Sequence, residues 1–227
     1  YDSFLDNLTR IADMGCGAGL DSAWWATLET RDDPPIPHNY QVYAVDKVNV
    51  IEPDILANNK NITFIEADFE QQRSIPIKVD LVWAHDVLQY ARDPLSCLIN
   101  WKQQMNVNGM LILAVPQTTF IRNNNLVVEN RNQLYNFNIL NLMYMLALAG
   151  FDTRDAYYYR KENSPWLYAA VYATDREPMP YTTTWYELAD KKLLLDSAIT
   201  SVNRYGYPKI EDLIICWLDK NFYTLSS

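Results

Sequence analysis

The stretch TRIADMGCGAG, residues 9–19, decides the fold predicted for this chain. Its first half, Thr9 to Met14, predicts a short strand that runs directly into the glycines Gly15, Gly17 and Gly19. Glycines at the carboxyl end of a strand let the backbone approach a ligand closely, and the helix that follows presents its first amides to that ligand. We therefore predict a strand, a glycine loop and a helix, with the loop as a binding site.

Strands and helices alternate after this unit. Further strands are expected at Gln41–Val45, Ile62–Ile65, Val79–Trp83 and Met110–Val115. Helices are expected at Leu20–Glu29, from Pro53 to about Asn58, from Pro94 through Met105 to a stop at Asn108-Gly109, and at Leu134–Ala149 before Gly150. The stretch Met110–Val115 is almost wholly apolar, which is typical of a central strand of a parallel sheet covered by helices on both faces.

Two aromatic-rich strands, Asp152–Tyr159 and Trp166–Ala173, are expected next, and the short polar link Lys161–Pro165 between them favours an antiparallel hairpin. The fold class predicted is therefore α/β: a doubly wound, mostly parallel seven-stranded sheet with an antiparallel C-terminal hairpin. The polar segment Gln117–Gln133 is interpreted as a long loop.

The remaining residues form a different unit, in which helical stretches near Trp185–Val202 and Ile210–Asn221 flank a turn. We predict a main domain over residues 1–174 and a helical C-terminal extension over residues 175–227, which serves as a lid, a docking element or a homodimer contact. Apolar residues supply the surface for docking on the sheet or on a second chain: Leu193, Leu194, Leu195, Ile199, Val202, Leu213, Ile214, Ile215 and Trp217.

Composition excludes several classes of protein. The chain has 227 residues, with 19 basic against 28 acidic side chains and a net charge of −9, which disfavours a nucleic-acid partner. Cys16, Cys97 and Cys216 have no metal-ligand spacing and fit reduced thiols, so neither a metal site nor a disulfide framework is expected. Neither a membrane-spanning run nor a signal peptide is visible, so we predict a cytoplasmic protein without a membrane partner.

The glycine spacing and one acid narrow the ligand. A dinucleotide fingerprint, G-x-G-x-x-G, needs its third glycine at position 20, but Gly19 comes one residue early and Leu20 occupies that place. Asp13, two residues before Gly15, would repel a pyrophosphate but would suit a ligand that bears an ammonium group. A nicotinamide-dependent oxidoreductase is therefore a disfavoured alternative.

The segment IADMGCGAG resembles the first motif of class I S-adenosylmethionine-dependent methyltransferases, (D/E)-x-G-x-G-x-G. Asp46 ends the second strand, where this family places an acid that accepts hydrogen bonds from both ribose hydroxyls. The segment Glu66–Phe69 resembles the one whose acid takes the adenine amino group and whose next side chain packs on the ring. The stretch Trp83–Pro116 is similar to the small-molecule branch of the superfamily, and the resemblance covers roughly residues 9–174.

The resemblance implies that the cofactor is S-adenosylmethionine and its product S-adenosylhomocysteine. The residues that it assigns to the cofactor are Asp13, Gly15, Cys16, Gly17, Gly19, Asp46, Lys47, Asp68, Phe69 and His85. The family commonly has Thr or Ser just after the glycines, whereas Leu20-Asp-Ser22 follow here, which leaves open the group that meets the methionine carboxylate. Eight residues precede the first strand, so the helix that closes over the cofactor in most relatives is expected either to be largely absent or to lie before Tyr1.

The activity implied is transfer of a methyl group to a small molecule, or less favourably to a protein, by in-line displacement. His85, Asp86 and Tyr90 are candidates for a general base. We expect Gln117–Gln133, Tyr157–Tyr159 and the C-terminal unit to select the acceptor. The alternative is a non-catalytic, regulatory protein that keeps the cofactor fold.

Several candidates also have structural interpretations. Asp46 and Asp68 suit helix N-caps, and Asp86 suits a cap of the turn after it. Phe69 suits a place in the core, and His85 suits a neutral imidazole that shapes the pocket.

Overall fold

The structure is a computed structural model that describes residues 5, 7–30, 32, 34–117, 120–122, 125–127, 133–160, 165–213 and 216–217. The strands are β1 (Arg10–Met14), β2 (Gln41–Asp46), β3 (Ile62–Glu66), β4 (Val79–His85), β5 (Met105–Pro116), β6 (Phe120–Arg122), β7 (Asn125–Val127), β8 (Phe151–Arg160), β9 (Trp166–Ala173) and β10 (Cys216–Trp217). The helices are α2 (Leu20–Ala26), α3 (Pro53–Asn58), α4 (Pro94–Gln103), α5 (Ile139–Ala149), α6 (Trp185–Asp190) and α7 (Asp196–Tyr205), with the 3₁₀ turns η1 (Leu88–Tyr90) and η2 (Ile210–Asp212).

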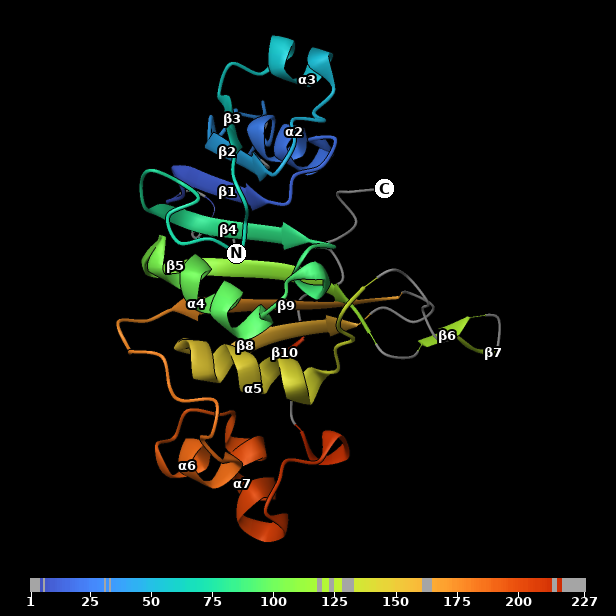
Figure 1. Cartoon of the computed structure of the whole chain (residues 1–227), viewed down its shortest axis with the longest axis vertical. Helices are drawn as coiled ribbons and strands as arrows, with labels where there is room; N and C mark the ends of the chain where they lie inside the picture. The colour runs from blue at the N-terminus through green and yellow to red at the C-terminus, as the bar shows by residue number, and fades with distance from the viewer. Residues whose placement is uncertain are drawn as a thin grey trace.

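The main sheet has the order β10-β8-β9-β5-β4-β1-β2-β3 (Figure 1). β3, β2, β1, β4 and β5 pair in parallel, whereas β9 pairs antiparallel with both β5 and β8. The predicted doubly wound, mostly parallel sheet of seven strands with an antiparallel hairpin is thereby confirmed, and β10 joins it as an eighth strand. The order changes direction at β1 and β4, so the carboxyl ends of these strands meet at a topological switch point, where ligands bind in such sheets.

Both faces of the sheet are covered where the apolar strands lie. Leu111 to Val115 of β5 are at most 1% exposed, as expected for a central strand. One face packs with α4 and α5 into a core that includes Trp101 and Leu146, and the other packs with α2 around Trp25 and Trp83. Figure 1 shows α4 and α5 in front of the strands, with α6 and α7 beyond α5.

Helix α4 ends five residues before the predicted stop at Asn108-Gly109. It begins at Pro94, and the side chain of Asp93 caps it by accepting a hydrogen bond from the Ser96 amide at 3.1 Å. Met105, which we expected on the helix, instead starts β5 and pairs with Val79 of β4. Pairing with β4 thus outweighs the local helical pattern.

One predicted end of each of two further helices was also inaccurate. Helix α2 ends at Ala26, three residues early, while α5 starts at Ile139 rather than Leu134. A capping box between Asn138 and Asn141 fixes the start of α5, because each side chain accepts from the other residue's backbone amide. Gly150 ends α5 in a left-handed conformation, as predicted.

The N-cap of α5 gives a test of this account of the fold. Replacement of Asn138 by Ala removes the acceptor for the Leu140 and Asn141 amides. We expect the free energy of unfolding to fall by about 1 kcal/mol. Denaturant unfolding followed by circular dichroism measures the change, and Asn138→Asp, which keeps the acceptor, should restore most of the stability.

The C-terminal extension is less helical than predicted. The stretch Trp185–Val202 is two helices, α6 and α7, because the chain turns through Lys192, which has a φ of 53°. Of the predicted helix Ile210–Asn221, residues 210–212 form a 3₁₀ turn and Cys216–Trp217 form β10, which pairs in parallel with β8 as an eighth strand. Residues 214–215 and 218–221 lie outside the described residues.

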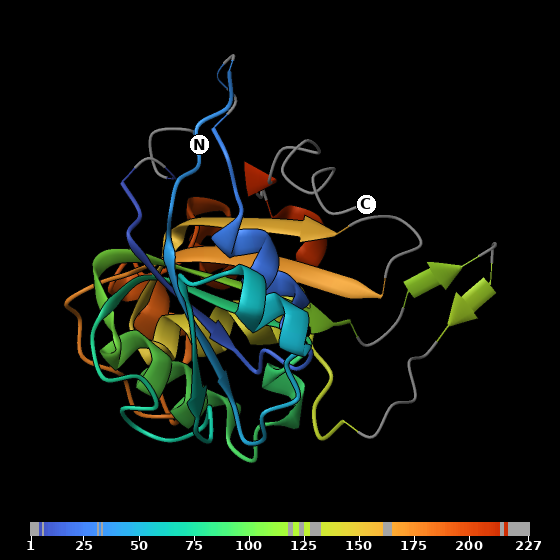
Figure 2. The ribbon, with the colours of Figure 1, turned by 90° about the horizontal axis from the view of Figure 1, so that it is seen from above.

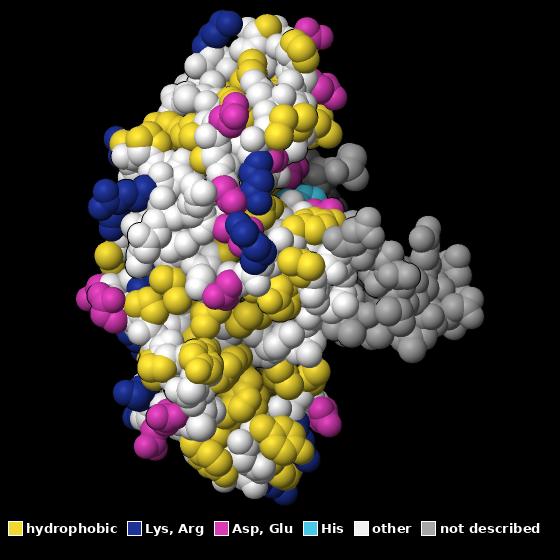
Figure 3. All heavy atoms as spheres, viewed as in Figure 1, with side chains coloured by type: hydrophobic (Ala, Val, Ile, Leu, Met, Phe, Trp, Pro, Cys, Tyr) yellow, Lys and Arg dark blue, Asp and Glu magenta, His cyan; other side chains and the backbone are white. Residues whose placement is uncertain are grey.

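The extension packs on the main domain. Leu188, Leu194, Leu195 and Val202 are at most 5% exposed and belong to the same core as α5. The Tyr144 hydroxyl on α5 also donates to the carbonyl of Thr183. Hydrophobic side chains gather over this end of the molecule in Figure 3. The described part of the extension thus packs against α5, and its role as a lid, a docking element or a homodimer contact stays a prediction.

We expected a long loop over Gln117–Gln133, but part of this segment forms strands. Its strands β6 and β7 form a small antiparallel hairpin that projects from the carboxyl end of β5 (Figure 2). The other residues of 118–132, and 161–164 of the predicted hairpin link, lie outside the described residues. Within the described part of the chain, every helix is too short or too polar to cross a bilayer.

Candidate functional site

The glycine loop lies at the carboxyl end of β1, fixed against β2. Gly15, Gly17 and Gly19 have φ angles of 70°, 49° and 83°, in the left-handed region that favours glycine. The amides of Gly15 and Cys16 both donate to the Val45 carbonyl, at 2.8 and 3.1 Å. The loop therefore turns back across the end of β2 before α2 begins.

The three glycines have different neighbours. A Cβ atom on Gly15 would lie 2.4 Å from Cγ2 of Val87, and one on Gly19 would lie 2.8 Å from Cγ2 of Ile51. A Cβ atom on Gly17 would meet nothing within 4 Å. Gly15 and Gly19 are thus required by packing, whereas Gly17 leaves open space at the rim of the loop, which a ligand could fill.

Asp46, the last residue of β2, holds this rim. Its Oδ2 accepts a hydrogen bond from the Gly17 amide at 3.0 Å, and its Oδ1 accepts one from the Lys47 amide at 2.7 Å. Each carboxylate oxygen can accept a second bond. Asp46 is thus held beside the open space with acceptor capacity left for a pair of hydroxyls, and the site fits the ribose that the resemblance implied.

Asp68 lies on the next stretch of chain, after β3, within a charged cluster. Its Oδ2 is 3.3 Å from Nζ of Lys47 and 3.9 Å from a guanidinium nitrogen of Arg92. Lys47 also lies 5.3 Å above the ring of Phe69. Phe69 itself is 7% exposed and packs toward Trp101. Most of its side chain therefore lies in the core, in keeping with its structural interpretation.

Asp13 and Cys16 lie beneath the loop. Asp13 is 2% exposed and accepts a hydrogen bond from the Ser22 hydroxyl at 2.5 Å. Burial raises the pKa of Asp13 to about 7, against the lowering effect of this bond. Burial, and then the charge of Asp13, raises the pKa of the Cys16 thiol. Asp13 thus links β1 to α2, and its contact with a ligand ammonium stays a prediction.

His85 ends β4 and faces an acid that the sequence analysis did not assign. Nδ1 of His85 lies 3.0 Å from Oδ2 of Asp21, and the same oxygen accepts a hydrogen bond from the Trp83 indole at 2.8 Å. Although burial alone would lower the pKa of His85, the hydrogen bond and charge of Asp21 raise it. Burial alone would raise the pKa of Asp21, but the hydrogen bonds from His85 and Trp83 lower it. His85 is thus paired with a carboxylate.

The other two candidates for a base lie in the turn after β4. Asp86 has a φ of 60°, and its Oδ1 accepts a hydrogen bond from the side-chain amide of Gln89. This contact places Asp86 within the turn, in keeping with its structural interpretation. Tyr90 ends η1 and is 39% exposed.

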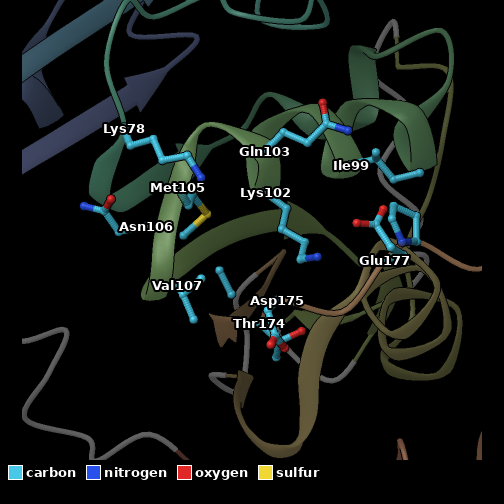
Figure 4. A pocket seen from close by; sticks show the side chains of 12 residues that line it. Lys78, Ile99, Lys102, Gln103, Met105, Asn106, Val107, Thr174, Asp175 and Glu177 are labelled. Atoms are coloured by element: carbon cyan, nitrogen blue, oxygen red, sulfur yellow. The ribbon is translucent and has the colours of Figure 1, made fainter.

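A separate cavity of about 200 Å³ lies at the opposite edge of the sheet, where β4 and β5 begin. Lys78, Lys102, Asp175 and Glu177 line it together with Met105 (Figure 4). Lys102 donates a hydrogen bond to the carbonyl of Arg176, and burial, followed by the charge of Arg176, lowers the pKa of its amine. None of the predicted site residues contributes to this cavity.

Residues 12–113 match the family model described as "Methyltransferase domain". This range contains the glycine loop and the acids and histidine at the ends of β2, β3 and β4. The match covers just under half of the chain, and it shows that this part of the chain is similar to a methyltransferase domain.

Individual relatives are distant. Malonyl-(acyl-carrier protein) O-methyltransferase 2 of Coxiella burnetii is 27% identical over 106 residues, which are 47% of this chain and 40% of that protein. The matched region thus spans less than half the length of this curated relative.

Solved structures share the fold. The 1,6-didemethyltoxoflavin-N1-methyltransferase of Burkholderia thailandensis, with bound S-adenosylhomocysteine, aligns with a TM-score of 0.58 at 16% identity, over 76% of this chain and 74% of that one. Magnesium protoporphyrin IX methyltransferase of Synechocystis, with bound S-adenosylmethionine, aligns with a TM-score of 0.53 at 18% identity, over 76% and 73%.

Proposed function

We propose that this protein transfers a methyl group from S-adenosylmethionine to a small molecule and leaves S-adenosylhomocysteine. The observation that carries the proposal is the open space at Gly17, with the Asp46 carboxylate fixed at 3.0 Å from the Gly17 amide. A loop that only joined β1 to α2 would need glycine at positions 15 and 19, where a side chain would clash. Packing alone does not explain the open space at Gly17 next to the Asp46 carboxylate.

The chain's own groups would hold the cofactor by recognisable chemistry. Asp46 accepts from the ribose hydroxyls. Asp68, just after β3, and Lys47, just after β2, lie 3.3 Å apart on the adenine side. Gly17 lets the cofactor approach the backbone. When bound, S-adenosylmethionine supplies a methyl group that its sulfonium charge already activates. What remains for the protein is to bind the acceptor in line, exclude water and accept any proton that the acceptor loses.

A small acceptor is supported by charge and by the surroundings of the site. A net charge of −9 disfavours a nucleic-acid substrate. The rings of Trp166 and Tyr168 on β9 lie 5.3 and 6.4 Å from His85, next to the carboxyl edge of the sheet. The two structural neighbours above are named for 1,6-didemethyltoxoflavin and magnesium protoporphyrin IX, neither of which is a nucleic acid or a protein.

We further propose that the chain divides at about residue 174, and that residues 175–227 brace the main domain. Two hydrogen bonds support this role. Thr153 of β8 donates to the Leu193 carbonyl, and the Met179 amide donates to the Leu148 carbonyl of α5 at 2.8 Å. Together with the buried leucines they tie the extension to both β8 and α5.

Replacement of Gly17 by Ala tests the cofactor site directly. The new methyl group enters the open space and, at a φ of 49°, costs roughly 1–2 kcal/mol of stability. We expect the Kd for S-adenosylmethionine, measured by calorimetry, to rise at least about 10-fold, which is about 1.4 kcal/mol.

Gly206→Ala is the matched control, because Gly206 also has a left-handed φ, 86°, but lies at the end of α7. It should lose similar stability and keep the wild-type Kd. Equal affinity in both variants would contradict the site. Release of labelled S-adenosylhomocysteine with an added acceptor then separates an enzyme from a protein that only binds the cofactor.

A further inference from the structure

We infer that Asp21 and His85 form an acid–base pair that removes the proton of a neutral, planar acceptor with a hydroxyl or ring N–H group. This inference rests on the proposed methyl transfer and specifies its substrate class. His85 is the catalytic residue of the pair, and Asp21 is a positioning residue that acts through it.

The geometry fixes one nitrogen of the histidine. Asp21 lies in the first turn of α2 and His85 at the end of β4, 64 residues apart in sequence, yet Oδ2 and Nδ1 are 3.0 Å apart. Trp83, on the same face of β4, donates to the same carboxylate oxygen at 2.8 Å and so holds it in place. A carboxylate at Nδ1 favours the tautomer with a proton there and leaves Nε2 as the base.

The pair is accessible and surrounded by rings. The side chains of His85 and Asp21 are 34% and 39% exposed, so a small molecule can reach them. The ring of Trp166 lies 5.3 Å from the imidazole at 73°, and those of Trp83 and Tyr168 lie 6.1 and 6.4 Å away. Aromatic walls at these distances favour a flat acceptor.

Charge argues for a neutral acceptor. Besides Asp21, the charged groups that act on His85 are the carboxylates of Asp86 and Asp13. Tyr168, which faces His85 from β9, stays a neutral phenol, because burial raises its pKa to about 12. An acceptor carboxylate would meet repulsion from these acids and would have no proton to release.

In the step itself, X is the oxygen or nitrogen atom of the acceptor that carries the proton. The proton passes from X to Nε2 of His85, and the electron pair of the broken X–H bond forms the new bond from X to the methyl carbon. The carbon–sulfur bond breaks, and its electrons remain on sulfur, which becomes a neutral thioether. His85 is then a protonated imidazolium beside the Asp21 carboxylate, and it later gives its proton to water.

The pair predicts a pH dependence with a defined sign. His85 acts as a base only when neutral, so kcat rises as the pH rises through its pKa. Asp21 raises that pKa, so Asp21→Asn should move the rising limb to lower pH and lower its plateau. A purely structural role for Asp21 would lower stability without moving the limb.

The first test is NMR titration of the full chain. The chain has two histidines, and the His38→Gln variant leaves His85 as the only one. We expect the pKa of His85 to lie above its ordinary value and to fall when Asp21→Asn is added. A pKa that does not change with this substitution would overturn the pair.

The second test uses S-adenosylmethionine with two sets of probes: phenols and hydroxylated N-heteroaromatics, and benzoates of the same size. The phenol-type probes should be methylated. His85→Gln should lower kcat by about 10²- to 10⁴-fold while calorimetry still detects the cofactor, and His38→Gln should match the wild type.

Each outcome of this test bears on a separate claim. Three outcomes would overturn the inference: methylation of benzoates alone, methylation of none of the probes, or an unchanged kcat in His85→Gln. If S-adenosylmethionine still binds, the proposed function stays intact in each case. Absence of cofactor binding to the wild type overturns the proposed function itself.

Discussion

Replacement of Asp46 by Ala is expected to weaken S-adenosylmethionine binding by at least about 100-fold, which corresponds to about 3 kcal/mol. Two charge-assisted hydrogen bonds from the ribose would be lost, each worth about 1.5–3 kcal/mol. The Gly17 amide would also lose the acceptor at 3.0 Å that holds the loop. Calorimetry with S-adenosylmethionine and with S-adenosylhomocysteine measures the effect on both ligands.

Glu66→Ala provides the matched control for charge. Glu66 pairs with Asp46 across β2 and β3 and is exposed, so its removal changes the net charge by the same amount at the same edge of the sheet. Its Kd should stay within about 3-fold of the wild type, the scale of an exposed charge worth less than about 1 kcal/mol. An equal rise in Kd for both substitutions would show that Asp46 acts only through its negative charge and not through hydrogen bonds to the ligand.

Replacement of Gly15 by Ala is expected to lower the free energy of unfolding by about 2–5 kcal/mol. A left-handed φ of 70° costs roughly 1–2 kcal/mol for a residue with a side chain. The new Cβ atom would lie 2.4 Å from Cγ2 of Val87, a clash that costs a further 1–3 kcal/mol, roughly. Chemical denaturation measures the loss.

Val87→Ala identifies the source of that loss. In the double variant the clash is relieved, so a double-mutant cycle should give a favourable coupling of about 1–3 kcal/mol between Gly15→Ala and Val87→Ala. A coupling near zero would mean that backbone strain alone explains the loss. The contrast with Gly17→Ala, where we expect a loss of cofactor binding without a clash in the core, separates the packing glycine from the ligand-facing glycine.

Local sequence signals were sufficient to predict much of the fold. The glycines after Met14 and the acid after Val45 lie within single elements, so their positions follow from the end of a strand without knowledge of its neighbours. The apolar β5 likewise indicated its central place, because only burial on both faces explains such a run.

Features that depend on pairing between distant segments were missed. Met105 fits a helical stripe by spacing, but Val79 of β4 pairs with it and converts it to strand. Cys216–Trp217 joins the sheet beside β8, a contact that no local pattern indicates.

The candidate site shows the same division. The sequence identified His85, but it did not identify Asp21 as its partner, because the two residues are 64 positions apart and meet only when α2 packs beside β4. The available signal was an acid in the first turn of α2, just after the glycines. Asp13 was predicted at the site, but its burial beneath the loop depends on Ser22 and could not be foreseen from its position before Gly15.

Titration of S-adenosylmethionine into the wild-type chain by calorimetry tests the central claim most directly. We predict one site per chain, with a Kd below about 1 mM, the upper end of the usual range for enzyme substrates, and loss of the binding heat in Asp46→Ala but not in Glu66→Ala. Absence of heat at millimolar S-adenosylmethionine, or wild-type binding in Asp46→Ala, would contradict the account.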